Sequence, residues 1–143
     1  MTLDNRKITK ELTNKIKTTS IKTSAASLSS CTLCPRNCKA DRNSGKTGFC
    51  GVDSTIYLAR AALHMWEEPC ISGKKGSGAV FFSGCGLRCC FCQNHDIAIG
   101  SRGLPVTVER LSEIFLELKE KGAANINLVT GTHYVPQIIQ ALD

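Results

Sequence analysis

Residues 79–92 read AVFFSGCGLRCCFC, and this stretch decides the fold. Its apolar start, Ala79 to Phe82, has the length and composition of a buried strand, and the Ser-Gly pair that follows begins a loop. The loop carries cysteines in a CxxxCxxC spacing; such thiolates are the usual ligands of iron–sulfur clusters, whereas zinc sites more often use paired CxxC units. The spacing therefore predicts a 4Fe–4S cluster with one iron left without a cysteine, on the ligands Cys85, Cys89 and Cys92. The alternative is three buried or zinc-binding thiols.

A second group of cysteines lies upstream, within residues 31–51. Glycines at 45, 48 and 51 permit tight turns around a metal ion. Four thiolates can close a tetrahedral zinc site or hold a second iron–sulfur cluster, and their softness suits both metals. Arg36 and Arg42 are close enough in sequence to offset the negative charge of these thiolates. The sequence leaves zinc and iron–sulfur open for the four ligands Cys31, Cys34, Cys38 and Cys50.

Beyond the cysteine loop, helix and strand patterns alternate. Thr107 has the side chain of a helix N-cap, and an apolar face of helical period predicts a helix that ends at Lys121, before Gly122. Residues 125–130 form the next predicted strand, and Pro136 opens a second helix. Strands that alternate with helices predict an α/β fold with a parallel sheet.

The chain divides into three parts by composition. Residues 1–30 form a basic leader and linker, with a short amphipathic helix predicted over 5–17. Residues 31–72 form a cysteine-rich metal-binding segment, which also contains a predicted strand at 55–63. Residues 73–143 form a core that stops inside its second helix. Because a parallel sheet of so few strands has uncovered faces, we expect a fragment of a longer protein or a truncated gene product, in preference to a piece completed by another polypeptide.

Composition narrows the setting in which the protein works. The chain has nine cysteines, an odd number, and neither a secretory leader nor a run of about 20 apolar residues. This combination argues against a disulfide framework and against a membrane partner, and it predicts metal or redox chemistry in a reducing cytoplasm. Residues 1–50 carry ten Lys or Arg against three Asp or Glu. Because no aromatic side chains interleave these lysines, the basic leader is expected to be a solvated surface and not a nucleic-acid site.

The cysteine loop resembles the cluster loop of the radical SAM superfamily, in the form Cys-x-x-x-Cys-x-aromatic-Cys. The flanking sequence resembles the pyruvate formate-lyase-activating-enzyme-like branch of that superfamily. The runs that carry this resemblance are FSGC at 82–85, CQN at 92–94, CTLCPRNC at 31–38, NLVT at 127–130 and THYVP at 132–136. The resemblance covers roughly residues 31–143. It implies a partial (β/α)6 barrel, of which this chain carries about two strands as an N-terminal portion.

The resemblance also implies an activity. It implies an oxidoreductase-type enzyme that reductively cleaves S-adenosylmethionine to a 5′-deoxyadenosyl radical, with a one-electron donor such as flavodoxin or ferredoxin. Within this branch, it implies activation of a protein substrate through a glycyl radical. No residue of this chain is assigned a catalytic role by the resemblance.

The resemblance implies cofactor contacts at two places. Phe91 stands at the aromatic position of the motif, where it would contact the adenine of S-adenosylmethionine. Many members carry Gly-Gly-Glu after the second strand to bind the amino group of S-adenosylmethionine, and this chain lacks that glutamate. Backbone carbonyls and hydroxyls are expected to substitute for it, at Thr130, Gly131 and Thr132. The close branch carries a proline where Gly131 stands.

A different class of protein remains as the alternative. In that hypothesis the chain is a non-catalytic zinc or iron–sulfur binding module, and its basic leader binds a protein or nucleic-acid partner. A colourless protein that contains zinc and no iron would distinguish this zinc module from a brown radical SAM protein.

Overall fold

Four strands form one open, mixed sheet in the computed structural model, which describes residues 26–100 and 103–143. The strand order is β3-β1-β2-β4. The strands are β1 (Ile56–His64), β2 (Ser77–Phe82), β3 (Leu104–Val106) and β4 (Ile126–Val129). The predicted α/β class is confirmed. The helix predicted over residues 5–17 lies outside the described residues.

The helices of the described residues are mostly short. They are α2 (Ala26–Ser29), α3 (Pro69–Ser72), α4 (His95–Ala98), α5 (Val108–Glu120) and α6 (Val135–Leu142), with 3-10 turns η1 (Arg42–Ser44) and η2 (Gly131–Tyr134). Helix α2 lies at the end of the stretch predicted as leader and linker, and it packs against η1. Across residues 26–100 and 103–143, no helix combines the length and the apolar character needed to cross a bilayer.

The predicted parallel sheet is only partly right. Strand β2 pairs in parallel with β4, with Val80 opposite Leu128, whereas β1 runs antiparallel to both β2 and β3. The reason is the connection at residues 65–76, which reverses the chain direction and so makes β1 and β2 antiparallel neighbours. Strand β3 was not predicted, since three residues with a central proline carry almost no strand signal.

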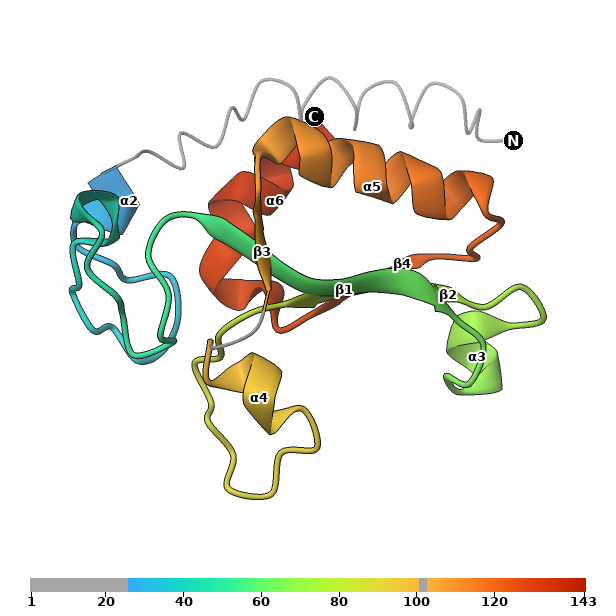
Figure 1. The fold of residues 1–143 in the computed structure, drawn as a ribbon, viewed down its shortest axis with the longest axis horizontal. Helices are drawn as coiled ribbons and strands as arrows, with labels where there is room; N and C mark the ends of the chain where they lie inside the picture. Colours follow the sequence, from blue (N-terminus) through green and yellow to red (C-terminus); the bar gives the residue numbers. More distant parts are fainter. Residues whose placement is uncertain (1–25, 101–102) are drawn as a thin grey trace, which may run out of the picture.

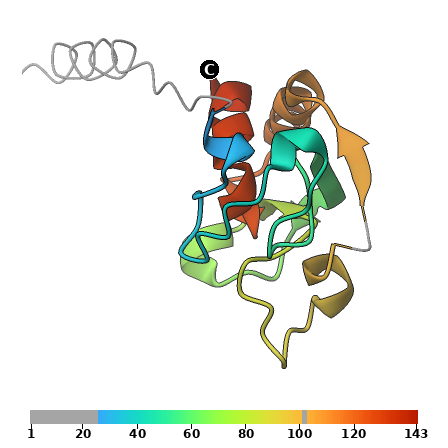
Figure 2. The ribbon, with the colours of Figure 1, turned by 90° about the vertical axis from the view of Figure 1, so that its left-hand side faces the viewer.

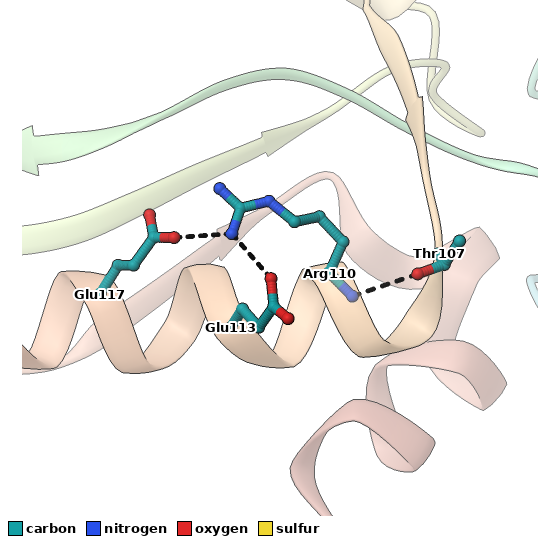
Figure 3. Close-up of polar contacts among 4 residues, drawn as sticks. All are labelled: Thr107, Arg110, Glu113 and Glu117. Atoms are coloured by element: carbon teal, nitrogen blue, oxygen red, sulfur yellow. Dashed lines mark hydrogen bonds and ion pairs between the residues drawn. The ribbon is translucent and has the colours of Figure 1, made fainter.

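Helix α5 forms as the sequence predicts. The hydroxyl of Thr107 accepts a hydrogen bond from the Arg110 backbone N–H at 3.2 Å, which satisfies a donor of the first turn. On the exposed face, the Arg110 guanidinium lies 2.9 Å from Glu113 and 2.6 Å from Glu117 (Figure 3). The chain leaves the helix through Gly122, whose φ is +88°. The buried face packs on the sheet through Leu111, Ile114, Phe115 and Leu118.

The arrangement of layers brings the two cysteine-rich stretches to one end of the sheet. Helix α5 covers one side of the sheet, and α4, with the loop that leads into it, lies on the other (Figure 1). Figure 2 shows α6 beside α5, and the two helices are in contact. Strands β2 and β4 run in parallel, so their carboxyl ends meet at one edge of the sheet. There the Thr130 hydroxyl donates a hydrogen bond to the Phe82 carbonyl at 2.8 Å.

Candidate metal and cofactor site

A cavity of about 340 Å³ lies where β2 and β4 end. Three separate segments line it: one from the upstream cysteine group, one from the loop after β2 and one from the turn after β4. This volume lies in the range of small-molecule sites. The lining residues are Cys34, Pro35, Arg36, Cys85, Gly86, Leu87, Thr130, Thr132 and His133.

The cavity brings together several residues that the sequence singles out. Cys85, Thr130 and Thr132 share its wall, although the first is far from the others in sequence. Phe91 does not line the cavity and is 86% exposed. Gly131 is buried behind the wall, where a Cβ atom would lie 2.9 Å from Ile138 Cδ1. Close packing therefore explains why glycine stands at this position.

The CxxxCxxC loop is open and only partly buried. Cys85 and Cys92 are half-buried, and Cys89 is exposed. The backbone curls the loop, because Arg88 has a φ of +51° and the Cys92 N–H bonds to the Cys89 carbonyl at 3.3 Å. The backbone N–H of Leu87 lies 3.4 Å from the Cys85 sulfur, a contact that suits a metal-bound thiolate.

The upstream cysteines divide into two groups. We call Cys31, Cys38 and Cys50 the cysteine cradle. The sulfurs of Cys38 and Cys50 lie 3.2 and 3.4 Å from the point where a Cβ on Gly48 would stand, so any side chain there would crowd both. Cys34 points elsewhere, onto the cavity wall. Among the described residues, no three His, Cys, Asp or Glu side chains form a group that is ready to hold a metal ion.

The pKa values of two cradle thiols, Cys38 and Cys50, shift in opposite directions. Hydrogen bonds from the backbones of Ala40 and Phe49, together with a weaker one from the Cys31 thiol, lower the pKa of Cys38. Burial raises the pKa of the Cys50 thiol, although its Val52 contact and the positive charge of Arg42 oppose that rise. Cys38 therefore ionises more readily than a free cysteine, and Cys50 less readily.

The two cysteine-rich stretches are joined directly. The Cys85 N–H donates to the Cys50 carbonyl at 3.1 Å, and Arg36 donates from Nε to the Gly86 carbonyl at 2.8 Å. The guanidinium carbons of Arg36 and Arg88 lie 4.1 and 4.7 Å from the centre of the Phe49 ring. Such cation–π contacts fix the two loops against each other. Arg36 therefore contacts the downstream loop, in addition to lining the cavity.

Replacing Gly84 with alanine is expected to loosen this junction. Gly84 has a φ of +84°, and a Cβ there would lie 2.7 Å from the Cys50 carbonyl oxygen. The left-handed backbone alone costs an alanine about 1–2 kcal/mol, and the clash adds to it. Gly122→Ala is the matched control, since its φ is +88° with no atom within 4 Å of the added Cβ. Urea unfolding of both metal-free variants should show the larger loss for Gly84→Ala; equal losses would contradict the close approach.

Arg42 and His133 connect the cradle to the cavity wall. Arg42 has no exposed surface; its Nη1 donates to the His133 carbonyl at 2.7 Å and lies 3.8 Å from the Cys31 sulfur. His133 is buried, with Nε2 2.9 Å from the Ser83 carbonyl, so this nitrogen carries the proton and donates it. The sequence suggested Arg42 only as a counter-charge and gave no signal for its contact with the turn after β4.

Burial makes His133 a source of acid sensitivity. Burial lowers the pKa of His133 from 6.5 to about 4, so the folded chain holds the ring neutral. As the pH falls, the unfolded chain is protonated at His133 before the folded chain. The contribution of the neutral ring to the free energy of unfolding is therefore full above about pH 6.5 and decreases down to about pH 4. The expected loss is about 3 kcal/mol. Urea unfolding at several pH values between 6.5 and 4 should show this decrease in the free energy of unfolding. His133→Gln should make the free energy of unfolding less dependent on pH over this range. His95→Gln, a substitution at an exposed site, should leave the pH dependence unchanged.

The comparisons with known proteins are sparse. No family model matches this chain. The chain is similar to the uncharacterized protein MJ0674 of Methanocaldococcus jannaschii, with 29% identity over 121 residues. The match covers 78% of this chain and 34% of that protein, so the chain spans about a third of the length of this relative. No solved structure matches.

Proposed function

We propose that this chain belongs to a radical SAM iron–sulfur protein, holds a 4Fe–4S cluster on the CxxxCxxC loop and positions S-adenosylmethionine in the cavity. One observation carries the proposal: the cavity places Cys85, a predicted cluster ligand, on the same wall as Thr130 and Thr132. These are two of the positions that the sequence resemblance assigns to the cofactor. Ligand sites at the carboxyl ends of parallel strands are the rule in α/β folds.

The residues present fit such a cluster by their chemistry. Cys85, Cys89 and Cys92 stand on one loop, where they are half-buried or exposed, and soft thiolates are the usual ligands of iron–sulfur clusters. The Leu87 N–H is in place to donate to a ligand sulfur. When bound, the cluster would supply the electron that breaks the sulfur–C5′ bond of S-adenosylmethionine and yields the 5′-deoxyadenosyl radical.

The chain's own residues would bind and orient the nucleotide. The hydroxyl of Thr130 donates to the Phe82 carbonyl, which leaves its oxygen lone pairs free to accept from the ammonium group of S-adenosylmethionine. Thr132 offers a second hydroxyl on the same turn. The Arg36 guanidinium brings a positive charge to the wall, where it can attract a carboxylate. Leu87 and Pro35 add apolar surface that excludes water.

The wider assignments follow from the same resemblance. Strands β2 and β4 pair in parallel with α5 between them in sequence, which is the unit from which a (β/α)6 barrel starts. We propose an oxidoreductase of the activating-enzyme-like branch, fed by a one-electron donor such as flavodoxin or ferredoxin. A protein substrate that receives a glycyl radical is the substrate class of that branch.

Anaerobic reconstitution tests the proposal. The chain is loaded with iron and sulfide in the absence of oxygen, and bound iron and acid-labile sulfide are measured. It is then reduced with dithionite in the presence of S-adenosylmethionine, and 5′-deoxyadenosine is quantified. A brown protein that forms 5′-deoxyadenosine supports the proposal. A colourless protein that retains neither iron nor sulfide refutes it.

A metal-binding module without catalysis is the second candidate, because the cysteine cradle lies apart from the cavity. Its thiols are close to one another, two of them are buried, and Cys34 does not face them. Structural zinc sites usually have four protein ligands, so this candidate needs a fourth ligand in addition to the three thiols. If this candidate is right, the purified chain contains zinc and no iron, and no 5′-deoxyadenosine forms when S-adenosylmethionine and dithionite are added.

A further inference from the structure

The last two cysteines of the CxxxCxxC loop form a CxxC pair, and the structure places them across a tight turn. Cys90 and Phe91 are the central residues of this turn. The bond from the Cys92 N–H to the Cys89 carbonyl, at 3.3 Å, closes it. The first and last Cα atoms of such a turn lie within about 7 Å of each other. Because disulfides span Cα separations of about 4.4–6.8 Å, the turn brings the two cysteines close enough for a disulfide.

Both thiols of the pair can be reached from solvent. Cys89 is exposed and Cys92 is half-buried, and both cysteines are free. Phe91, between them, is 86% exposed, so the turn lies on the surface. Thiol–disulfide exchange depends on access to the sulfur that attacks. We therefore expect Cys89 to react first with a reagent from solvent and Cys92 to react second.

The surroundings of the pair favour a bond within it. A bond between the adjacent residues Cys89 and Cys90 would strain the disulfide geometry. The sulfur of Cys85 lies 3.4 Å from the Leu87 N–H and faces the cavity. The pair follows β2, the first strand of the parallel unit that β2, α5 and β4 form. A CxxC pair beside a β-α-β unit is a typical setting for thiol redox chemistry.

We propose that Cys89 and Cys92 are a redox-active dithiol, which a small-molecule disulfide such as oxidised glutathione converts to an intramolecular disulfide. The Cys89 thiolate attacks one sulfur of glutathione disulfide, which forms a mixed disulfide and releases one glutathione thiolate. The Cys92 thiolate then attacks the Cys89 sulfur, which forms the bond between the two cysteines and releases the second glutathione thiolate. The protein thiols lose two electrons and two protons, and one glutathione disulfide becomes two molecules of glutathione.

The dithiol needs no metal, so it stands without the proposed function. One consequence does rest on the proposed function: the disulfide and the cluster would compete for the same two thiols. A sulfur in a disulfide is no longer a thiolate, which is the form that binds a metal. Oxidation would therefore remove Cys89 and Cys92 as cluster ligands, and exchange with a thiol reductant would restore them.

Peptide mapping of the full, metal-free chain tests the dithiol. Reduced protein is incubated with oxidised glutathione, the remaining thiols are alkylated with iodoacetamide, and trypsin releases the peptide of residues 89–102. We expect this peptide to carry an alkyl group on Cys90 alone and to lack the two thiol hydrogens of Cys89 and Cys92. In Cys90→Ala the same disulfide should form, and the peptide should carry no alkyl group.

Two controls show whether the second exchange step takes place. In Cys92→Ser the reaction cannot pass its first step, so glutathione should remain on Cys89. Cys70 is exposed in α3 and belongs to no CxxC pair, so it should keep its glutathione in the parent chain. Three results on the parent chain would overturn the proposal: glutathione that remains on Cys89, a bond from Cys89 to a cysteine other than Cys92, or alkylation of all three cysteines of the peptide.

A protection experiment separates this inference from the proposed function. Anaerobically reconstituted chain is incubated with oxidised glutathione, then denatured, alkylated and mapped in the same way. If the loop holds a cluster, Cys89 and Cys92 should be protected and should both be recovered in alkylated form. A disulfide that forms as readily in the reconstituted chain as in the metal-free chain would refute the cluster on this loop and retain the dithiol. A metal-free chain that forms no such disulfide would refute the dithiol and leave the cluster to be judged by its iron content.

Discussion

Replacing Cys89 with alanine is expected to abolish 5′-deoxyadenosine formation and to remove one cluster's iron from the reconstituted chain. Three thiolates are already the minimum in the proposed site, and two cannot hold a cubane cluster with the usual cysteine ligation. Cys89 is exposed on the loop, so the substitution leaves no cavity in the core. Bound iron, acid-labile sulfide and 5′-deoxyadenosine are measured on anaerobically reconstituted protein. No 5′-deoxyadenosine should be detectable in Cys89→Ala.

Cys90→Ala is the control for this experiment. Cys90 is the next residue, is also exposed and lies between the predicted ligands, where the spacing of the motif gives it no role. Its variant should keep the parent's iron content and product yield. Loss of iron in both variants, or in neither, would mean that the loop does not bind a cluster through the predicted thiols.

Truncating Phe82 to alanine is expected to give the largest loss of stability among the substitutions considered. Phe82 is fully buried at the end of β2, and its ring centre lies 5.6 Å from that of Tyr134. The ring also packs where a Cβ on Gly131 would stand 3.4 Å away, so it supports the cavity wall from behind. Phe→Ala in a core costs about 3–5 kcal/mol, through lost burial and the remaining void. Urea unfolding of the metal-free chain measures this.

Leu116→Ala provides the comparison. Leu116 lies on α5 with 55% of its surface exposed. Surface substitutions usually change stability by no more than about 0.5 kcal/mol. If Phe82→Ala proves as mild as Leu116→Ala, the ring is not part of a tightly packed core and the cavity wall lacks the support described above.

The sequence predicts those parts of the fold that depend on local signals. The Thr107 cap, the helical period of α5 and Gly122 specify one helix without help from tertiary contacts. The apolar run at 79–82 is long enough to identify the core of β2. For the site, the cysteine spacing and the position of Thr130 after a strand are local signals too, and the structure places Cys85 and Thr130 on one cavity wall.

The remainder depends on contacts between distant residues, which no local pattern encodes. The antiparallel pairing of β1 with β2 follows from the path of residues 65–76. The three residues of β3 form a strand because they pair with β1. The position of Cys34 on the cavity wall, away from the cradle, also depends on how two loops pack. Arg42 is an arginine beside cysteines in the sequence, whereas its burial and its bond to the His133 carbonyl come only from the folded chain.

The central claim is that the loop of Cys85, Cys89 and Cys92 holds a cluster next to a nucleotide pocket. Electron paramagnetic resonance of the reconstituted, dithionite-reduced chain, recorded before and after S-adenosylmethionine is added, tests it most directly. We predict the signal of a reduced 4Fe–4S cluster, absent in Cys89→Ala, whose shape changes when S-adenosylmethionine binds. A silent spectrum, or a signal that persists in Cys89→Ala and is unchanged by S-adenosylmethionine, would contradict the claim.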